Sequence, residues 1–409
     1  MRVVVIGSGA AGNIASFTVR KLCPDADVSI FSEDSLPEYS PCLLTDYIAG
    51  SISRQQLFLK SFSDYEERGI RTFFGEEVLK IDPAAKKVYS KERVARYDRL
   101  ILATGSSPVI PKIAGVDKKG VFTLKSLQDV DGILAHPGKR VVVVGSGPIG
   151  THASVAFMEK GYTVHLIELL NSILPAVFDE KPASIIQRAF EEHGINVLTG
   201  EKVLEIIGNG KVTIVRTSKR SVDCDMVILA AGMKPNVGLA AEAGLKLGDH
   251  CGIKVNKQMM TSEADIFACG DCVETESVIT GRPALSLLWP SARIQGTVAA
   301  HNCCGKARSH PGTIDVIGVN LSRFHAVSMG LIGNSVNNQD LEIIEKEYPS
   351  HYYRFLLSNK VLVGAQFINR TRYSGTIFSV LQKKTTVDMI RYMVEKRKLP
   401  SASALMVGK

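Results

Sequence analysis

The sequence of 409 residues predicts an α/β protein that contains the same βαβ unit twice. Residues 2–12 read RVVVIGSGAAG and residues 140–150 read RVVVVGSGPIG, so an apolar strand runs twice into a glycine-rich loop. Small and apolar residues at helical spacing follow each loop, and a second apolar strand comes next, at 28–31 and at 164–167. This repeated order of strand, glycine loop, helix and strand predicts two domains with parallel sheets.

The spacing of the glycines is typical of a loop that binds the pyrophosphate of a dinucleotide. The first glycine permits a tight turn, the second lets the backbone approach the phosphates, and the third lets the helix pack closely on the strand. The N-terminus of the helix adds unpaired N–H groups and the positive end of its dipole. An acidic residue after the second strand is expected to accept hydrogen bonds from the ribose. The glycines are Gly7, Gly9 and Gly12 in the first loop and Gly145, Gly147 and Gly150 in the second, and the acidic residues are Glu33 and Glu168.

Three further apolar strands support two dinucleotide sites, because each ends in a short segment that contains glycine. They lie within residues 97–108, 222–236 and 261–272. A single glycine motif is often only a turn, whereas two copies with flanking strands and a downstream acid predict two Rossmann-like domains. The strand ends add to the candidate site residues Thr104, Gly105, Gly232, Gly270 and Asp271.

The order of these motifs predicts that one dinucleotide-binding domain is inserted in the other. The first domain is expected to comprise residues 1–115 and 250–312, and the second residues 116–249. Residues 313–409 combine an alternating apolar stretch, HYYRFLLSNKVLVGAQFI, with a helical pattern, TIFSVLQKKTTVDMIRYMVE. They are therefore expected to form a small C-terminal α+β domain.

The composition excludes several classes of protein. Hydrophobic residues make up 45% of the chain, which argues against disorder, and no apolar run approaches the roughly 18 residues of a membrane span. The apolar start reads as a strand that enters a glycine loop rather than as a signal peptide. The formal net charge of +8 comes without a dense basic patch or a known nucleic-acid module, so a nucleic-acid partner is not expected. A solvated basic surface and an acidic protein partner both remain open.

The eight cysteines predict free thiols in a reducing cytoplasm, because no export signal is present. Only Cys269 and Cys272, in CGDC, and the adjacent Cys303 and Cys304 are close in sequence. No second C-x-x-C accompanies the first, so no metal site is expected.

With these motifs in this order, the chain resembles the two-dinucleotide FAD/NAD(P)H oxidoreductases of the pyridine nucleotide–disulfide reductase superfamily over residues 1 to about 305. Three segments, YSPCLLTDYIAGSI, SLLWPSARIQGTVAAHN and YYRFLL…VLVGAQFIN, are most similar to NADH:rubredoxin oxidoreductases and to the flavin-binding part of NAD(P)H nitrite reductases. A second group that it resembles comprises coenzyme A-disulfide reductases and NADH oxidases or peroxidases. In that group a single cysteine follows the second strand at the interval where Cys42 stands.

The resemblance implies that the first βαβ unit holds FAD. The first three glycines would face its pyrophosphate, Glu33 the adenosine ribose, Val78 the adenine through its backbone, and Asp271 the ribityl chain. In the coenzyme A-disulfide reductases the acid aligns instead with Ser32. The resemblance assigns Thr104, Gly105 and Gly270 to the FAD site as well.

The resemblance also implies that the second unit binds NAD(H) at its three glycines, at Glu168 and at Gly232. A carboxylate accepts the free 2′-hydroxyl and repels a 2′-phosphate, and Leu169 and Leu170 supply no arginine, so NADH is preferred. His152 stands where the family usually has a glutamate near the nicotinamide. A role there and simple packing both remain open.

By this resemblance we predict an FAD-dependent oxidoreductase that moves electrons between NADH and a one-electron iron–sulfur acceptor. The acceptor would be a rubredoxin- or ferredoxin-type protein, or a subunit of a larger complex in which this chain is the flavin subunit. Trp289 would lie near the flavin segment or serve packing alone. Homo-oligomers and hetero-oligomers both remain open.

Two alternatives to electron transfer to an iron–sulfur protein remain open. The first is disulfide, oxygen or peroxide reduction with Cys42 as the catalytic residue, although Pro41 before it and Leu43 and Leu44 after it depart from that group's pattern. The second alternative is a non-catalytic flavin-binding subunit.

Overall fold

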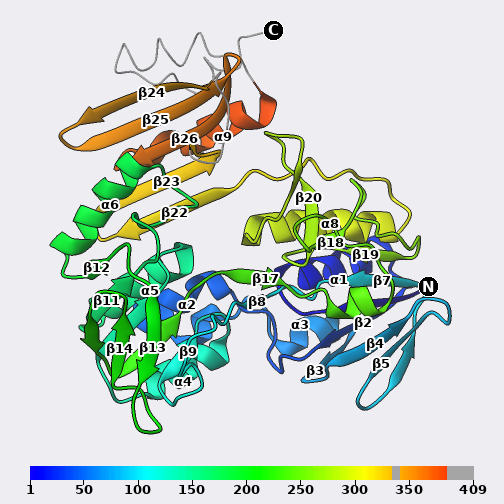
Figure 1. Ribbon diagram of the computed structural model, residues 1–409. Helices are drawn as coiled ribbons and strands as arrows, with labels where there is room; N and C mark the ends of the chain where they lie inside the picture. The colour runs from blue at the N-terminus through cyan, green and yellow to red at the C-terminus, as the bar shows by residue number, and fades with distance from the viewer. Residues whose placement is uncertain (334–340, 385–409) are drawn as a thin grey trace. The chain divides into compact units, whose positions relative to one another are not determined.

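The computed structural model describes residues 1–333 and 341–384, which form two compact units (Figure 1). The first unit comprises 1–47, 52–107 and 233–313, and the second comprises 48–51, 108–232 and the described residues from 314 onward. This division assigns residues 233–249 to the first unit, whereas the sequence analysis placed them in the inserted domain. It also groups the C-terminal segment with the second unit. Which cofactor each unit holds stays a prediction.

The first unit is built around a five-stranded parallel sheet in the order β19-β7-β1-β2-β3. Its strands are β1 (Arg2–Ile6), β2 (Asp27–Ser32), β3 (Ile70–Phe74), β7 (Arg99–Leu102) and β19 (Ile266–Ala268). Valines and isoleucines follow one another without polar alternation because both faces of the sheet are covered.

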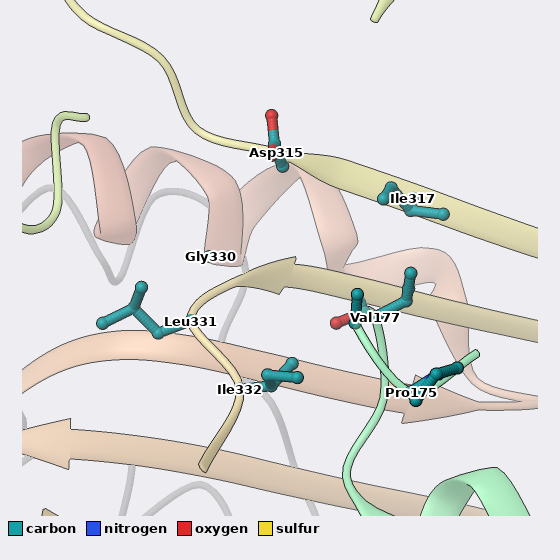
Figure 2. Close-up of a pocket in the computed structure, with 9 residues that line it drawn as sticks. Pro175, Val177, Asp315, Ile317, Gly330, Leu331 and Ile332 are labelled. Atoms are coloured by element: carbon teal, nitrogen blue, oxygen red, sulfur yellow. The ribbon is translucent and has the colours of Figure 1, made fainter. Parts of the chain in front are cut away.

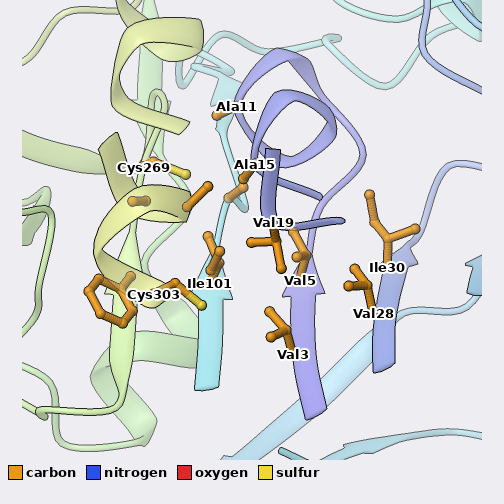
Figure 3. Close-up of a cluster of buried hydrophobic side chains, with 14 of the residues drawn as sticks. Val3, Val5, Ala11, Ala15, Val19, Val28, Ile30, Ile101, Cys269 and Cys303 are labelled. Atoms are coloured by element: carbon orange, nitrogen blue, oxygen red, sulfur yellow. The ribbon is translucent and has the colours of Figure 1, made fainter. Parts of the chain in front are cut away.

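Helices α1 (Ala10–Leu22) and α8 (Trp289–Cys303) pack side by side against this sheet (Figure 3). A Cβ atom on Gly296 would overlap the carbonyl oxygen of Ala11, so the two backbones lie in close contact. Near the other end of the pair, the Cys304 thiol points at the carbonyl oxygen of Val19. Ala11 and Gly296 meet near the start of the two helices, and Val19 and Cys304 meet near their ends, so the helices run parallel.

Smaller elements complete the first unit. A three-stranded antiparallel sheet has the order β4-β5-β6, a second small sheet has the order β18-β20-β21, and β8 pairs with β17. Their bounds are β4 (Val78–Asp82), β5 (Lys87–Ser90), β6 (Val94–Arg96), β8 (Ser106–Pro108), β17 (Met233–Pro235), β18 (Ile253–Lys254), β20 (Val273–Glu276) and β21 (Pro283–Ala284). The short helices are η1 (Pro41–Leu43), α2 (Leu44–Ala49), η2 (Arg54–Leu57), α3 (Phe62–Glu67) and α7 (Gly238–Glu242).

The second unit repeats the same core. Its parallel sheet has the order β12-β11-β10-β16-β9, and β10 lies between β11 and β16 as β1 lies between β2 and β7. The strands are β9 (Val121–Thr123), β10 (Arg140–Val144), β11 (Thr163–Ile167), β12 (Asn196–Leu198) and β16 (Met226–Leu229), with helices α4 (Leu127–Ala135), α5 (Pro148–Glu159) and α6 (Glu180–Glu192). An antiparallel sheet of β13 (Val203–Ile207), β14 (Ile214–Thr217) and β15 (Ser221–Asp223) packs with it. The predicted α/β fold with two Rossmann-like sheets is confirmed.

The C-terminal segment forms an antiparallel sheet in the order β22-β23-β26-β25-β24, followed by α9. The bounds are β22 (Val316–Leu321), β23 (Phe324–Gly330), β24 (Leu341–Tyr348), β25 (His351–Ser358), β26 (Val361–Ile368), η4 (Thr371–Tyr373) and α9 (Ser374–Lys383). The alternating apolar stretch predicted from the sequence forms β25 and β26. The helical pattern forms α9 as far as it is described, and its part beyond residue 384 lies outside the described residues.

A buried carboxylate joins this sheet to α6 within the second unit. Asp179 precedes α6, is 3% exposed, and accepts hydrogen bonds from Arg354 Nε (2.8 Å), Gln366 Nε2 (3.0 Å) and the Gly333 N–H (2.8 Å). A buried charge is stable only when it is paired and hydrogen-bonded, and here all three donors come from the C-terminal segment.

A pocket of about 290 Å³ lies near this junction, between the loop before α6 and strands β22 and β23 (Figure 2). Its lining is mostly apolar, with Asp315 and Ser328 as its polar side chains. None of the residues that the sequence analysis singled out lines it.

The described residues contain no helix long and apolar enough to cross a membrane. Within the same residues, no group of three or more histidine, cysteine or acidic side chains is arranged to hold a metal ion.

We expect Gly296→Ala to destabilise the protein by about 1–3 kcal/mol, because the new methyl group would press on the backbone of α1. Chemical denaturation followed by circular dichroism measures this change. Gly238→Ala is the matched control, because it adds a methyl group to open space in a helix of the same unit. If both variants unfold at the same denaturant concentration, the close packing of α1 on α8 is contradicted.

Candidate functional site

The two glycine loops have the same backbone geometry. Gly7 and Gly145 have φ values of +107° and +101°, which side-chain-bearing residues rarely adopt. A Cβ atom on Gly12 would overlap the carbonyl oxygen of Gly7, and one on Gly150 would overlap that of Gly145. The first and third glycines of each loop are therefore needed by the fold itself.

The middle glycines differ from these. A Cβ atom on Gly9 or Gly147 would have no protein atom within 4 Å. Each is the N-cap residue of its helix, α1 or α5, and no side chain caps either N-terminus. Phosphate oxygens can therefore approach the first N–H groups of each helix, and both loops fit the pyrophosphate of a dinucleotide.

Glu168 lies directly after β11 and is 8% exposed. Its Oε2 accepts hydrogen bonds from the N–H (2.9 Å) and the hydroxyl (2.7 Å) of Ser146, and its Oε1 accepts one from the Leu170 N–H (2.9 Å). These three donors fix the carboxylate beside the second glycine loop, where it can accept a ribose hydroxyl.

In the first unit, Ser32 occupies the position that corresponds to Glu168. Phe31 pairs with Ile6 at the end of β1 as Ile167 pairs with Val144 at the end of β10, and Ser32 is the next residue. The Ser8 hydroxyl donates to Ser32 Oγ over 2.7 Å, as the Ser146 hydroxyl donates to Glu168. Glu33 follows one position later with an exposed side chain. A role of Glu33 at a ribose stays a prediction.

The strand ends of the first sheet bring further predicted residues together. β1, β7 and β19 are parallel neighbours, so Gly7, Thr104 and Gly270 lie at one edge of the sheet. The Ser106 hydroxyl donates to Asp271 Oδ2 over 2.8 Å. The buried Gln295 of α8 accepts the Gly270 N–H over 2.8 Å. Asp271 is thus fixed at the same edge as the first glycine loop.

Asn236 holds the segment after β7. Its side chain donates to the Thr104 carbonyl oxygen (2.9 Å) and accepts from the Ser107 hydroxyl (2.7 Å). The Thr104 hydroxyl donates to the Asn236 carbonyl oxygen (2.6 Å). The sequence analysis missed Asn236, Ser106 and Gln295 as supporting residues. The one sequence signal for Ser106 and Asn236 is that each follows closely after an apolar strand that ends in glycine.

Cys42 lies in η1, just before α2, and its side chain is exposed. Partial desolvation raises the pKa of its thiol, the Asp271 carboxylate raises it further, and a hydrogen bond with Ser40 lowers it. The fold therefore places this thiol within electrostatic reach of Asp271 and keeps it protonated at neutral pH.

The segment before Cys42 is anchored to helices α1 and α8. The buried carboxylate of Glu38 pairs with Arg293 Nη1 of α8 over 3.3 Å, and burial raises the pKa of Glu38. The Glu38 N–H donates to the Tyr65 hydroxyl (3.2 Å), which donates to Asn13 Oδ1 of α1 (2.6 Å). Asn13 in turn donates to the carbonyl oxygen of Ser8 in the first glycine loop. These contacts hold the Cys42 segment in a defined position.

Other candidate side chains are less exposed. Cys269 and Cys272 are fully buried, and burial raises the pKa of both thiols. His152 lies in α5, where its Nδ1 contacts the Pro148 carbonyl oxygen of the same helix over 2.7 Å. Trp289 begins α8 and packs, partly buried, against the core of the first unit.

Three predicted residues remain, Gly105, Val78 and Gly232, and the carbonyl oxygen of Gly105 accepts the Asn236 N–H. Val78 is a buried residue at the start of β4. Gly232 is exposed just before β17, and its carbonyl oxygen accepts the Val109 N–H.

Comparison with known proteins identifies a family. A family model described as pyridine nucleotide-disulphide oxidoreductase matches residues 1–302. An NADH oxidase from Methanocaldococcus jannaschii is 35% identical over 347 residues, which are 80% of this chain and 77% of that protein. A solved NAD-dependent persulfide reductase from A. fulgidus superposes with a TM-score of 0.91 at 26% identity and covers 96% of this chain and 79% of its own.

A third relative has a different role. The assimilatory nitrate reductase electron transfer subunit of Bacillus subtilis is 29% identical over 398 residues. The match takes in 96% of this chain, which spans about half of that protein. The match extends through the C-terminal segment as well as through both glycine loops.

We expect Gly9→Ala to keep the thermal stability of the protein and to weaken FAD binding by tenfold or more, because its methyl group would project toward the phosphates. Gly12→Ala is the matched comparison and should lower the melting temperature, because its methyl group meets the backbone of Gly7. The absorbance ratio at 450 and 280 nm and a thermal melt of the apoprotein measure both quantities. Normal FAD retention by Gly9→Ala would contradict the assignment of the loop.

Proposed function

The chain belongs to the pyridine nucleotide-disulphide oxidoreductase family, and on this premise we propose that it uses NADH to reduce a disulfide or persulfide that reacts at Cys42. Members of the family use FAD and NAD(P)H, so the chain is an NAD(P)H-dependent flavin oxidoreductase. One observation carries the choice of acceptor: the exposed Cys42 thiol lies within electrostatic reach of Asp271, at the edge of the sheet that bears the first glycine loop.

Bound FAD would supply a carrier that takes two electrons from NADH and delivers them at this edge. The first glycine loop would bind its pyrophosphate, and Asp271 would accept hydrogen bonds from its ribityl hydroxyls. Val78 and Glu33 would contact its adenosine. The hydrogen bonds from Ser106 to Asp271 and from Gly270 to Gln295 would keep this side of the site in place without ligand.

Cys42 would act as the nucleophile. Its sulfur attacks one sulfur of the disulfide, the S–S bond breaks, and the first product leaves as a thiol that carries the former Cys42 proton. The two electrons and the proton of the NADH hydride, together with one proton from solvent, would then cleave the mixed disulfide, release the second thiol and restore Cys42. Because partial desolvation and the Asp271 carboxylate both raise the pKa of the Cys42 thiol, the first step is expected to become faster as the pH rises above neutral.

The similarity to a persulfide reductase supports this acceptor class over the iron–sulfur acceptor predicted first. Delivery of single electrons to an iron–sulfur protein is the second candidate. The net charge of +8 and the match over nearly the whole chain to an electron transfer subunit favour it. In that case Cys42 would take no part in turnover.

The two candidates predict different electron counts. Mildly pre-oxidised holoenzyme titrated anaerobically with dithionite should take up about four electrons per FAD if Cys42 is redox-active, and Cys42→Ser about two. In steady-state assays Cys42→Ser should lose at least 100-fold in NADH-dependent disulfide reduction and keep NADH:ferricyanide activity, which needs flavin alone.

Cys251→Ser is the control, because it removes the other exposed thiol, which lies on a turn. If Cys42→Ser keeps both the electron count and the disulfide activity of the wild type, the thiol mechanism is wrong and the iron–sulfur acceptor becomes the leading candidate. The titration is made in protein that carries Cys23→Ser throughout, so that no disulfide formed by Cys23 adds to the electron count.

We also propose that Glu168 selects NADH. Glu168→Arg should raise KM for NADH at least tenfold and reverse the preference toward NADPH, because an arginine attracts the 2′-phosphate that the carboxylate repels. Steady-state ferricyanide assays with each nucleotide measure both constants. Leu204→Arg, at an exposed position of β13 in the same unit, controls for added charge alone. An unchanged ratio of kcat/KM for the two nucleotides in Glu168→Arg would overturn the assignment.

A further inference from the structure

Three cysteines that the proposed function does not use meet at one end of the first unit. Cys23 follows α1 and caps its C-terminus, Cys303 is the last residue of α8, and Cys304 caps that helix. Cys303 is 2% exposed, whereas Cys23 and Cys304 are both partly accessible. All three pack against the same apolar core, and Figure 3 shows Cys303 of α8 next to the strand that carries Ile101.

Cys23 and Cys304 converge on a single backbone atom. The Cys23 N–H donates to the Val19 carbonyl oxygen over 2.8 Å, and the Cys304 thiol points at the same oxygen, with Sγ 4.0 Å away. The two thiols are also close enough to affect each other's protonation, because the Cys304 side chain raises the pKa of the Cys23 thiol. The parallel packing of α1 on α8 therefore holds two accessible thiols next to each other, although they are far apart in sequence.

From this geometry we infer that Cys23 and Cys304 form a reversible disulfide that joins the C-terminal ends of α1 and α8. The oxidant is a low-molecular-weight disulfide. The Cys23 sulfur attacks one of its sulfurs, the S–S bond breaks, and one small thiol leaves with a proton. The Cys304 sulfur then attacks the Cys23 sulfur of the mixed disulfide, the protein S–S bond forms, and the second small thiol leaves with the second proton. Two protein thiols are oxidised and one small disulfide is reduced.

The surroundings of Cys23 and Cys304 determine the rate at which the disulfide forms. Burial raises the pKa of the Cys23 thiol to about 11, and the neighbouring Cys304 thiol acts in the same direction. Only the thiolate attacks a disulfide, so the pair is slow at neutral pH and its rate rises about tenfold for each pH unit below that pKa. The pair is accordingly a slow oxidation site that responds to sustained exposure.

The disulfide would stabilise the first unit, because it ties together two helix ends that are distant in sequence. It lies beyond the C-terminal end of α1, whereas the first glycine loop precedes the N-terminus of that helix. Oxidation is therefore expected to change stability and to leave NADH:ferricyanide turnover unchanged.

The test uses FAD-loaded full-length protein incubated with oxidised glutathione at pH 7.5 and at pH 8.5. Non-reducing peptide mapping should identify a Cys23–Cys304 link that forms about tenfold faster at the higher pH and disappears with dithiothreitol. The melting temperature of the oxidised protein should rise by roughly 5 °C relative to the reduced protein. Cys42→Ser should form the same link, which separates this inference from the proposed role of Cys42.

The variants Cys23→Ser and Cys304→Ser should lose both the link and the rise in melting temperature, whereas Cys303→Ala and Cys251→Ser should keep them. A link between Cys303 and Cys304, or glutathione bound singly to Cys23, would overturn the inference. So would complete oxidation without any change in melting temperature, because the two helix ends would then not be joined in the folded state.

Discussion

The close approach of a helix N-terminus to the end of a buried parallel strand is the constraint on which the rest of the molecule depends. Gly12 meets the carbonyl oxygen of Gly7, and Gly150 meets that of Gly145, with no room for a side chain. This contact directs α1 and α5 so that their first N–H groups face open space. It also aligns α1 beside α8, and through Asn13 and Tyr65 it reaches the segment that carries Cys42.

The fold could be predicted from sequence wherever periodicity and glycine spacing determine it. The two valine-rich strands at 2–6 and 140–144 are apolar on both faces, which is typical of a parallel sheet covered on both sides. The glycine spacing then predicts the turn that leads from each strand into the following helix. Part of the antiparallel C-terminal sheet could also be predicted, because HYYRFLLSNKVLVGAQFI contains two stretches of alternating apolar residues joined by a short turn. The division between units was less visible, because residues 233–249 carry no composition change where they join the first unit.

The candidate site was predicted less completely, for a physical reason. Residues that are expected to contact a ligand through a recurring motif, such as Gly9 or Glu168, have a fixed spacing. Residues that support them across the fold do not: Gln295 holds Gly270, and Arg293 pairs with Glu38, through contacts between distant segments. The contact between the Cys23 and Cys304 regions could likewise not be predicted, since it depends on how α1 and α8 align rather than on any local sequence pattern.

The equivalence of Ser32 and Glu168 has a consequence for how each site responds to salt. In the second unit the carboxylate is buried and held by three donors, so ions in solution screen its field only weakly. Discrimination between nucleotides that differ by a phosphate should thus persist at cellular ionic strength. In the first unit the buried position holds a neutral hydroxyl, and the acidic Glu33 lies in solvent, where its field is screened. The two copies of one architecture therefore differ in the place of one negative charge, which is buried at Glu168 in the second unit and exposed at Glu33, one position further along the chain, in the first.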